Sequence, residues 1–197
     1  MTVETNFYVM DGKLGVNLNK VITSVTLTAN PSQPEYPGYP HKLGDRVQGN
    51  HGSEWMLVKA SATVSAFNCV AINAAHGAVN VSISHATGGT TGYTFGIAHF
   101  QTQGGVSVGA ATGGVANAED LFWALLKSNG GAKVNVTVTT DTGNNLFISS
   151  TPGRLVATTG TLQLAGIQTA ATVGGATAVE VIQNSYLMPI RYFIATA

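Results

Sequence analysis

Two stretches of the sequence decide the fold class: residues 54–60, EWMLVKA, and residues 68–73, NCVAIN. Both are short runs rich in apolar, β-branched or aromatic residues, and both are bounded by glycine-containing or polar turns, as β-strands are. Similar runs recur roughly every 8–12 residues between Gly-Gly, Asn-Gly-Gly and Thr-Gly-Asn-Asn turns, a spacing typical of a β-barrel or β-sandwich. We therefore predict an all-β fold. The further candidate strands are residues 79–84, 93–100, 106–108, 133–139, 145–149, 154–158, 162–167 and 179–183.

The sequence of 197 residues is unusually poor in charge, because only 9% of its residues are charged and their formal sum is zero. Soluble domains average roughly 25%. Without an excess of basic residues, the chain lacks the electropositive surface that binds nucleic acid or anionic membranes, so neither partner is expected. No Asp, Glu, Lys or Arg lies between Lys59 and Glu119, or from Leu155 to Val179. Uncharged strand faces invite association, so we predict an obligate oligomer.

The N-terminal part differs in composition from the rest of the chain. Residues 21–28 alternate as a strand does, and prolines then follow at a spacing of three, at Pro31, Pro34, Pro37 and Pro40. We predict an extended arm with a Pro-rich linker over residues 1–42 and a β domain over residues 43–197. The prolines suit either a stiff spacer or a polyproline II strip that docks on aromatic side chains.

Residues 117–127, NAEDLFWALLK, are ambiguous. Asn117 suits a helix N-cap, acidic residues follow in the first turn, and Gly130 lies just beyond Lys127, as at a helix end. The apolar run within the segment equally suits a strand that is buried on both faces. Taken alone, these residues slightly favour the helix.

The sequence contains no convincing catalytic or metal site. Ser107 lies in a G-x-S-x-G pattern, but the last histidine, His99, precedes it, whereas hydrolases with this motif place the histidine downstream. The histidines lack metal-ligand spacing, and Glu119 and Asp120 are adjacent and point apart. Cys69, alone in an apolar run, is expected to be a buried thiol. We predict a protein that is not an enzyme and carries no cofactor or metal.

Several segments resemble one known family. Residues 43–62, LGDRVQGNHGSEWMLVKASA, look like the opening of head decoration, or cement, proteins of tailed bacteriophages. The segments FGIA at 95–98, FWAL at 122–125, TPGRL at 151–155 and AGI at 165–167 resemble later strand starts and turns of that family in the same order. The resemblance covers about residues 43–190 and leaves out the Pro-rich segment and the residues before it.

The resemblance implies a virion structural protein with a compact β domain. Such proteins assemble as homotrimers on the outer surface of the icosahedral capsid, bind the major capsid protein between capsomers and stabilise the shell; the chain would be made in the host cytoplasm. In that family the Trp-containing segment is a strand, which tips the choice at 117–127 toward a strand. The alternative is a phage fibre or other virion component that binds host glycans. For partner binding we nominate two segments of the arm, with these residues: Thr2, Asn6, Phe7, Tyr8, Tyr36 and Tyr39.

Overall fold

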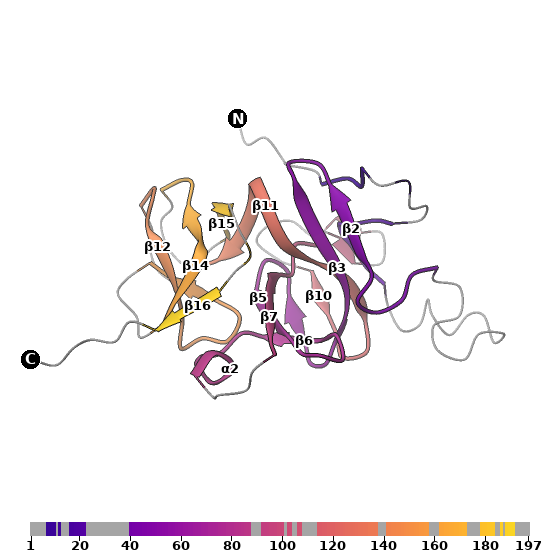
Figure 1. Cartoon of the computed structure of the whole chain (residues 1–197), viewed down its shortest axis with the longest axis horizontal. Helices are drawn as coiled ribbons and strands as arrows, with labels where there is room; N and C mark the ends of the chain where they lie inside the picture. Colours follow the sequence, from indigo (N-terminus) through magenta and orange to yellow (C-terminus); the bar gives the residue numbers. More distant parts are fainter. Residues whose placement is uncertain are drawn as a thin grey trace, which may run out of the picture.

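The protein is nearly all β and contains a closed barrel, so the predicted fold class is confirmed (Figure 1). The fold is that of a computed structural model. It describes residues 7–10, 12, 16–22, 40–87, 92–100, 102–103, 106–107, 114–137, 141–157, 162–172, 178–183, 186 and 188–191.

Five strands close the barrel. They are β3 (Ser53–Ala60), β5 (Cys69–Ile72), β6 (Gly77–Asn80), β7 (Thr94–Ile97) and β11 (Leu121–Asn135). Antiparallel pairs join β3 to β11, β11 to β7, β7 to β5 and β5 to β6. A parallel pair between β6 and β3 closes the ring, with Lys59 opposite Gly77.

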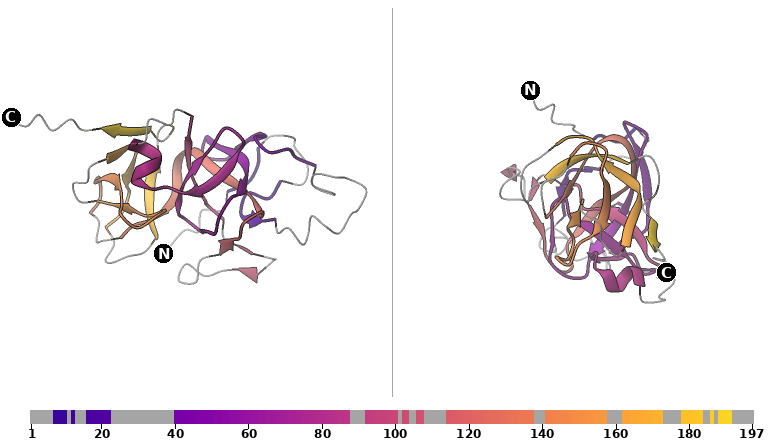
Figure 2. Two further views of the ribbon diagram at one scale, coloured as in Figure 1. Left: turned by 90° about the horizontal axis from the view of Figure 1, so that it is seen from below. Right: turned by 90° about the vertical axis from the view of Figure 1, so that its left-hand side faces the viewer.

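A second sheet continues from the barrel through β11, which belongs to both. Its other strands are β12 (Asn145–Ile148), β13 (Leu155–Val156), β14 (Leu162–Thr169), β15 (Ala178–Gln183) and β16 (Met188–Arg191). The order is β13-β12-β14-β15-β11, and β16 pairs with β14. A bridge between Val136 and Leu155 brings β13 back to the end of β11. Viewed from the side of the second sheet, its strands curve around a common axis (Figure 2, right).

Two glycines allow β11 to pass from one sheet to the other. The strand pairs with β3 up to Lys127 and with β15 from Ser128 onward, and its register shifts between Ser128 and Ala132. Gly130 and Gly131 occupy this irregularity with φ of +153° and +72°, values that residues with a Cβ rarely adopt. The Asn-Gly-Gly sequence at 129–131, expected to be a turn, therefore forms a bulge within one long strand.

The remaining elements are short. They are β1 (Lys20–Val21), β2 (Arg46–Gly49), β4 (Val64–Ser65), β8 (Thr102–Gln103), β9 (Val106–Ser107), β10 (Val115–Ala116) and the helix α2 (Ile83–Thr87). The candidate strand over residues 79–84 was wrong in its second half, because β6 ends at Asn80 and α2 begins at Ile83. Ser82 lies at the helix start, where its hydroxyl contacts His85 in the first turn.

The ambiguous segment forms a strand, not a helix. The backbone N–H of Asn117 donates to the carboxylate of Asp120 (2.9 Å), and Glu119 has a positive φ of +75°, so residues 117–120 form a tight turn. β11 then begins at Leu121.

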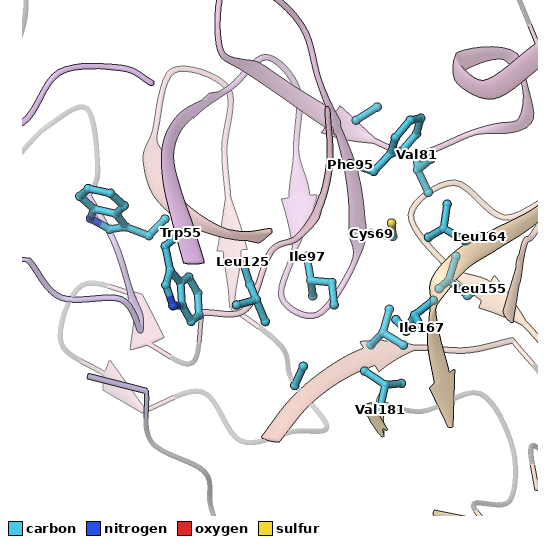
Figure 3. Close-up of a cluster of buried hydrophobic side chains, with 14 of the residues drawn as sticks. Trp55, Cys69, Val81, Phe95, Ile97, Leu125, Leu155, Leu164, Ile167 and Val181 are labelled. Atoms are coloured by element: carbon cyan, nitrogen blue, oxygen red, sulfur yellow. The ribbon is translucent and has the colours of Figure 1, made fainter. Parts of the chain in front are cut away.

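Neighbouring side chains of β3 and β11 divide between two core clusters. Trp55 and Trp123 belong to the first cluster, while Met56 and Phe122, one position along each strand, belong to the second. The first cluster runs from the barrel into the second sheet, and Figure 3 follows it from Trp55 past Leu125, Ile97 and Cys69 to Leu164 and Val181.

This two-sided burial bears on the shortage of charge. All four residues of β5 are buried, as are three of the four in β7, and both strands lie in the charge-free stretch between Lys59 and Glu119. Strands that are buried on both faces have no solvent face on which to carry charge. Part of the composition is thus explained within one chain.

Segments before residue 43 contribute to both core clusters. Phe7, Leu18, Val21 and Ile22 are all buried, and Ile22 forms an antiparallel bridge with Leu121 of β11. These parts of the predicted arm therefore pack on the barrel. The Pro-rich run at residues 31–39 lies outside the described residues.

Candidate functional site

Residues 7–10 lie along the edge of β2, where Val9 forms an isolated antiparallel bridge with Gly49. The backbone N–H of Met10 donates to the carbonyl of Gln48 (2.9 Å), and that of Asn50 donates to the carbonyl of Tyr8 (3.0 Å). The Asn50 side chain in turn accepts from the N–H of Tyr8 (3.0 Å). Because side chains alternate along a strand, Phe7 and Val9 turn to the core, and Tyr8 and Met10 turn outward.

The outward side chains belong to an exposed surface on which large hydrophobic residues surround polar and charged ones. Tyr8, Met10 and Tyr186 are the exposed large hydrophobic residues of the described chain, with 62%, 69% and 43% of their surface accessible. Met10 lies opposite Gln48, and Gln48 lies opposite Glu54 in the β2–β3 ladder. Tyr186, which follows β15, reaches Glu54 with its hydroxyl. We call this surface the Tyr8–Tyr186 patch; its residues are Tyr8, Met10, Arg46, Gln48, Glu54 and Tyr186.

A charged group lies at the centre of the patch. Arg46 Nη1 is 2.7 Å from Glu54 Oε1, and the Tyr186 hydroxyl donates to the other carboxylate oxygen. Partial burial raises the pKa of Glu54, but hydrogen bonds from Tyr186 and Arg46 and the charge of Arg46 outweigh it, so the pKa is below its usual value. The same hydrogen bond to Glu54, aided by desolvation, raises the pKa of Tyr186. Glu54 therefore remains ionised and Tyr186 protonated at neutral pH.

The nominated binding residues fall into three groups. Tyr8 is exposed in the patch, whereas Phe7 is 2% exposed and packs against Trp55 of its own chain. Thr2, Asn6, Tyr36 and Tyr39 lie outside the described residues. Sequence reasoning missed Met10, although the alternation of 7–10 gives it the same outward direction as Tyr8. It also missed Tyr186, which no local pattern connects with Glu54, 132 positions away.

A close serine–histidine contact among the described residues has a structural role. Ser82 Oγ lies 2.7 Å from His85 Nδ1, the separation of a nucleophile and its base. The backbone N–H of Ser82 also faces Nδ1 (3.1 Å), and the N–H of His85 donates to the Ser82 carbonyl (3.1 Å). The bond from the Ser82 N–H to Nδ1 is one half of a capping box, in which His85 takes the usual place of Glu or Gln.

Cys69, as expected, is a buried thiol. It lies in the first core cluster, and burial raises its pKa to about 12. A thiol with such a pKa is almost wholly protonated at neutral pH, so it is a weak nucleophile.

Other features that could assign a function are lacking in the described part of the chain. Its histidine, cysteine and acidic side chains form no group of three that could hold a metal ion. Its helical residues include no segment of the length and apolarity needed to cross a bilayer. No protein-family model and no curated protein matches the sequence.

Proposed function

We propose that the chain is a virion structural protein that decorates and stabilises the outer surface of a tailed-phage capsid. It acts as a homotrimer that bridges capsomers through contacts with the major capsid protein. A clamp of this kind requires contact area and a rigid body, and each additional contact on the shell is strengthened by effective concentration. The sequence resemblance over residues 43–190 supplies the class of partner.

The observation that carries the proposal is the composition of the Tyr8–Tyr186 patch. Tyrosine, methionine and arginine are the residue types enriched in the buried centres of protein interfaces. Here Tyr8, Met10, Arg46 and Tyr186 gather on one surface although they come from three separate parts of the chain. The hydrogen bonds around Glu54 fix Arg46 and Tyr186 before any partner binds, so less side-chain entropy is lost on association.

The barrel behind the patch is well suited to bear load. Glu54 lies on β3, a strand that pairs with β2, β6 and β11. Force applied at Arg46 and Glu54 therefore passes into a closed ring of strands rather than into a loop.

Exposed turns of the charge-free stretch support a contact that is not mainly ionic. Residues 61–63 and 73–75 are exposed and consist of Ser, Ala, Thr and Asn alone. Surfaces without charge gain little from ion pairing, so salt has few interactions to screen.

We expect the purified protein to be a trimer whose mass is the same in low and in molar salt. Size-exclusion chromatography with multi-angle light scattering measures this directly. A monomer in both conditions would contradict the homotrimer, and a trimer that dissociates in molar salt would contradict the non-ionic interface.

The double variant Tyr8→Ser/Met10→Ser is expected to bind capsids of the same virus about tenfold more weakly or worse, because truncating a buried aromatic anchor commonly costs more than 1 kcal/mol. Co-sedimentation with capsids that lack the decoration protein gives the affinity. Ser150→Ala, at an exposed position just after β12 and outside the patch, is the control and should bind as the wild type does. Equal binding by the double variant would contradict the role of the patch. Glycan binding without capsid binding would favour the fibre alternative.

A further inference from the structure

His99 is a fully buried imidazole that no part of the proposed function uses. Its side chain is 0% exposed, and neither ring nitrogen has a hydrogen-bond partner among the described residues. Buried polar groups are almost always paired, so an unpaired imidazole in a core calls for an explanation.

Three aromatic rings surround this imidazole and form what we call the His99 cage. The ring centroids of Phe7, Trp55 and Phe67 lie 5.0, 6.1 and 5.1 Å from that of His99, all in edge-to-face geometry. Phe7 and Trp55 also contact each other, at 5.0 Å. A neutral imidazole fits such surroundings, whereas an imidazolium would be a desolvated charge without a partner.

The three rings are held very differently. Trp55 lies on β3 and is paired on both sides, with β2 and with β11, and the backbone of Phe67 bonds to Ala98 and Asn135. Phe7 belongs to the edge segment 7–10. The segment is held by the backbone bonds of Tyr8 and Met10 and by one bond from Asn19 Nδ2 to the Phe7 carbonyl (3.0 Å). Of the three sides of the cage, the Phe7 side therefore opens with the least disruption.

We propose that His99 makes the docking of segment 7–10 sensitive to acid: protonation of its imidazole releases Phe7 from the cage and removes Tyr8 and Met10 from the patch. Water entering through the vacated Phe7 site solvates the imidazolium. The rest of the barrel stays folded. The Tyr8–Tyr186 patch thus exists at neutral pH and is dismantled in acid.

The charged groups around the cage favour this response. Burial, aided by the charge of Lys133 on β11, lowers the pKa of His99 to about 4. Weak backbone hydrogen bonds of His99 and Gly131, which fall short of full hydrogen-bond geometry, only partly oppose this shift. Among the described residues, no carboxylate pairs with His99. β3 contributes Trp55, whose Nε1 donates to Ser53 Oγ (2.9 Å). The ring centroids of His51 and Phe7 are 6.1 Å apart. The described residues thus place no anion beside His99 that would stabilise an imidazolium inside the closed cage.

The size of the effect follows from the two pKa values. The imidazole has a pKa of 6.5 when solvated and about 4 when caged. Once it is protonated in both the open and the closed state, this difference shifts the equilibrium constant for opening by up to about 300-fold. Opening begins as the pH falls below 6.5 and its driving force is complete near pH 4. At neutral pH the imidazole is neutral in the closed state and mostly neutral in the open state, so this drive is small.

Hydrogen–deuterium exchange on the purified full chain tests the inference without capsids, so its outcome is independent of the proposed function. Between about pH 7 and pH 4, after correction for intrinsic exchange rates, we expect residues 7–10 to lose protection while Leu121–Leu126 of β11 keep theirs. His99→Leu, which fills the cage with an apolar side chain, should keep residues 7–10 protected at both values. His51→Ala, which removes the other imidazole on Phe7, should respond as the wild type does.

Protection of residues 7–10 that survives at about pH 4 in the wild type would overturn the inference. So would loss of protection in His99→Leu, a lost response in His51→Ala, or simultaneous exposure of β11. If His99→Leu does not fold, NMR titration of the His99 ring in wild type and in Phe7→Ala decides the matter. The pKa should rise from about 4 toward 6.5 when Phe7 is removed, and an unchanged pKa would overturn the inference.

Discussion

Gly153→Ala is expected to lower the free energy of unfolding by about 2–5 kcal/mol, because the added methyl group meets both backbone strain and occupied space. Gly153 has a φ of +79°. A Cβ at this position would lie 2.4 Å from Asn68 Nδ2 and 2.7 Å from Asn80 Oδ1. Neither amide can move away freely, since the same two atoms are hydrogen-bonded to each other at 2.9 Å.

The effect is large because Gly153 lies where the second sheet meets the barrel. Its carbonyl accepts from the N–H of Cys69 and its N–H donates to the carbonyl of Val81, both at 2.8 Å. Asn135, at the end of β11, donates to Asn68 Oδ1 (2.9 Å) and completes the amide group. A methyl group here displaces paired polar atoms that are largely shielded from water, which costs more than displacing apolar ones.

Gly143→Ala is the matched control for this prediction. Gly143 has a similar φ of +82°, but a Cβ there meets nothing within 4 Å. Only the backbone strain remains, so we expect a loss of about 1–2 kcal/mol. Urea denaturation of both variants followed by circular dichroism measures the difference. Equal losses of stability in the two variants would contradict the prediction, because they would show that the side-chain amides of Asn68 and Asn80 move aside without destabilising the fold.

The fold class could be predicted from the sequence, whereas the path of β11 could not. Short apolar runs between glycine turns predict strands because turns and alternation are local properties, and strands formed at Cys69–Ile72 and Asn145–Ile148. Residues 121–126 show no periodic pattern of apolar and polar residues, because every one of them is buried. Periodicity distinguishes strand from helix only when one face meets water. The N-cap and charge signals at 117–127 thus favoured the helix, although Asp120 uses its carboxylate to close a turn.

The candidate surface shows the same limit over longer distances. Tyr8 was nominated from the sequence, but its neighbours Glu54 and Tyr186 come together only through the pairing of β2 with β3 and the position of the chain after β15. The shortage of charge is likewise non-local in origin. It arises in part because β5 and β7 are buried on both faces within their own chain. The low fraction of charged residues is therefore weaker evidence for an oligomer than it is when read from the sequence alone.

Phe122→Ala and Trp123→Ala are each expected to cost about 3–5 kcal/mol of stability, the range for truncation of fully buried aromatic residues. On a strand with one solvent face, one of two adjacent truncations would be nearly neutral. Here Phe122 packs on Phe100 (5.4 Å between ring centroids) in the second cluster, and Trp123 packs on His41 (5.6 Å) in the first. Both side chains are 0% exposed. Each variant therefore opens a cavity in a different cluster.

Asn129→Ala, on the same strand but exposed, should change stability by no more than about 0.5 kcal/mol. Urea midpoints of the three variants give the comparison. If the alanine variants do not fold, Phe122→Leu and Trp123→Phe should still show losses similar to each other. A large loss in one member of the pair with none in the other would mean that β11 has a solvent face. In that case burial within the chain could not account for the missing charge, and the uncharged strands would have to be covered by another copy or by the capsid.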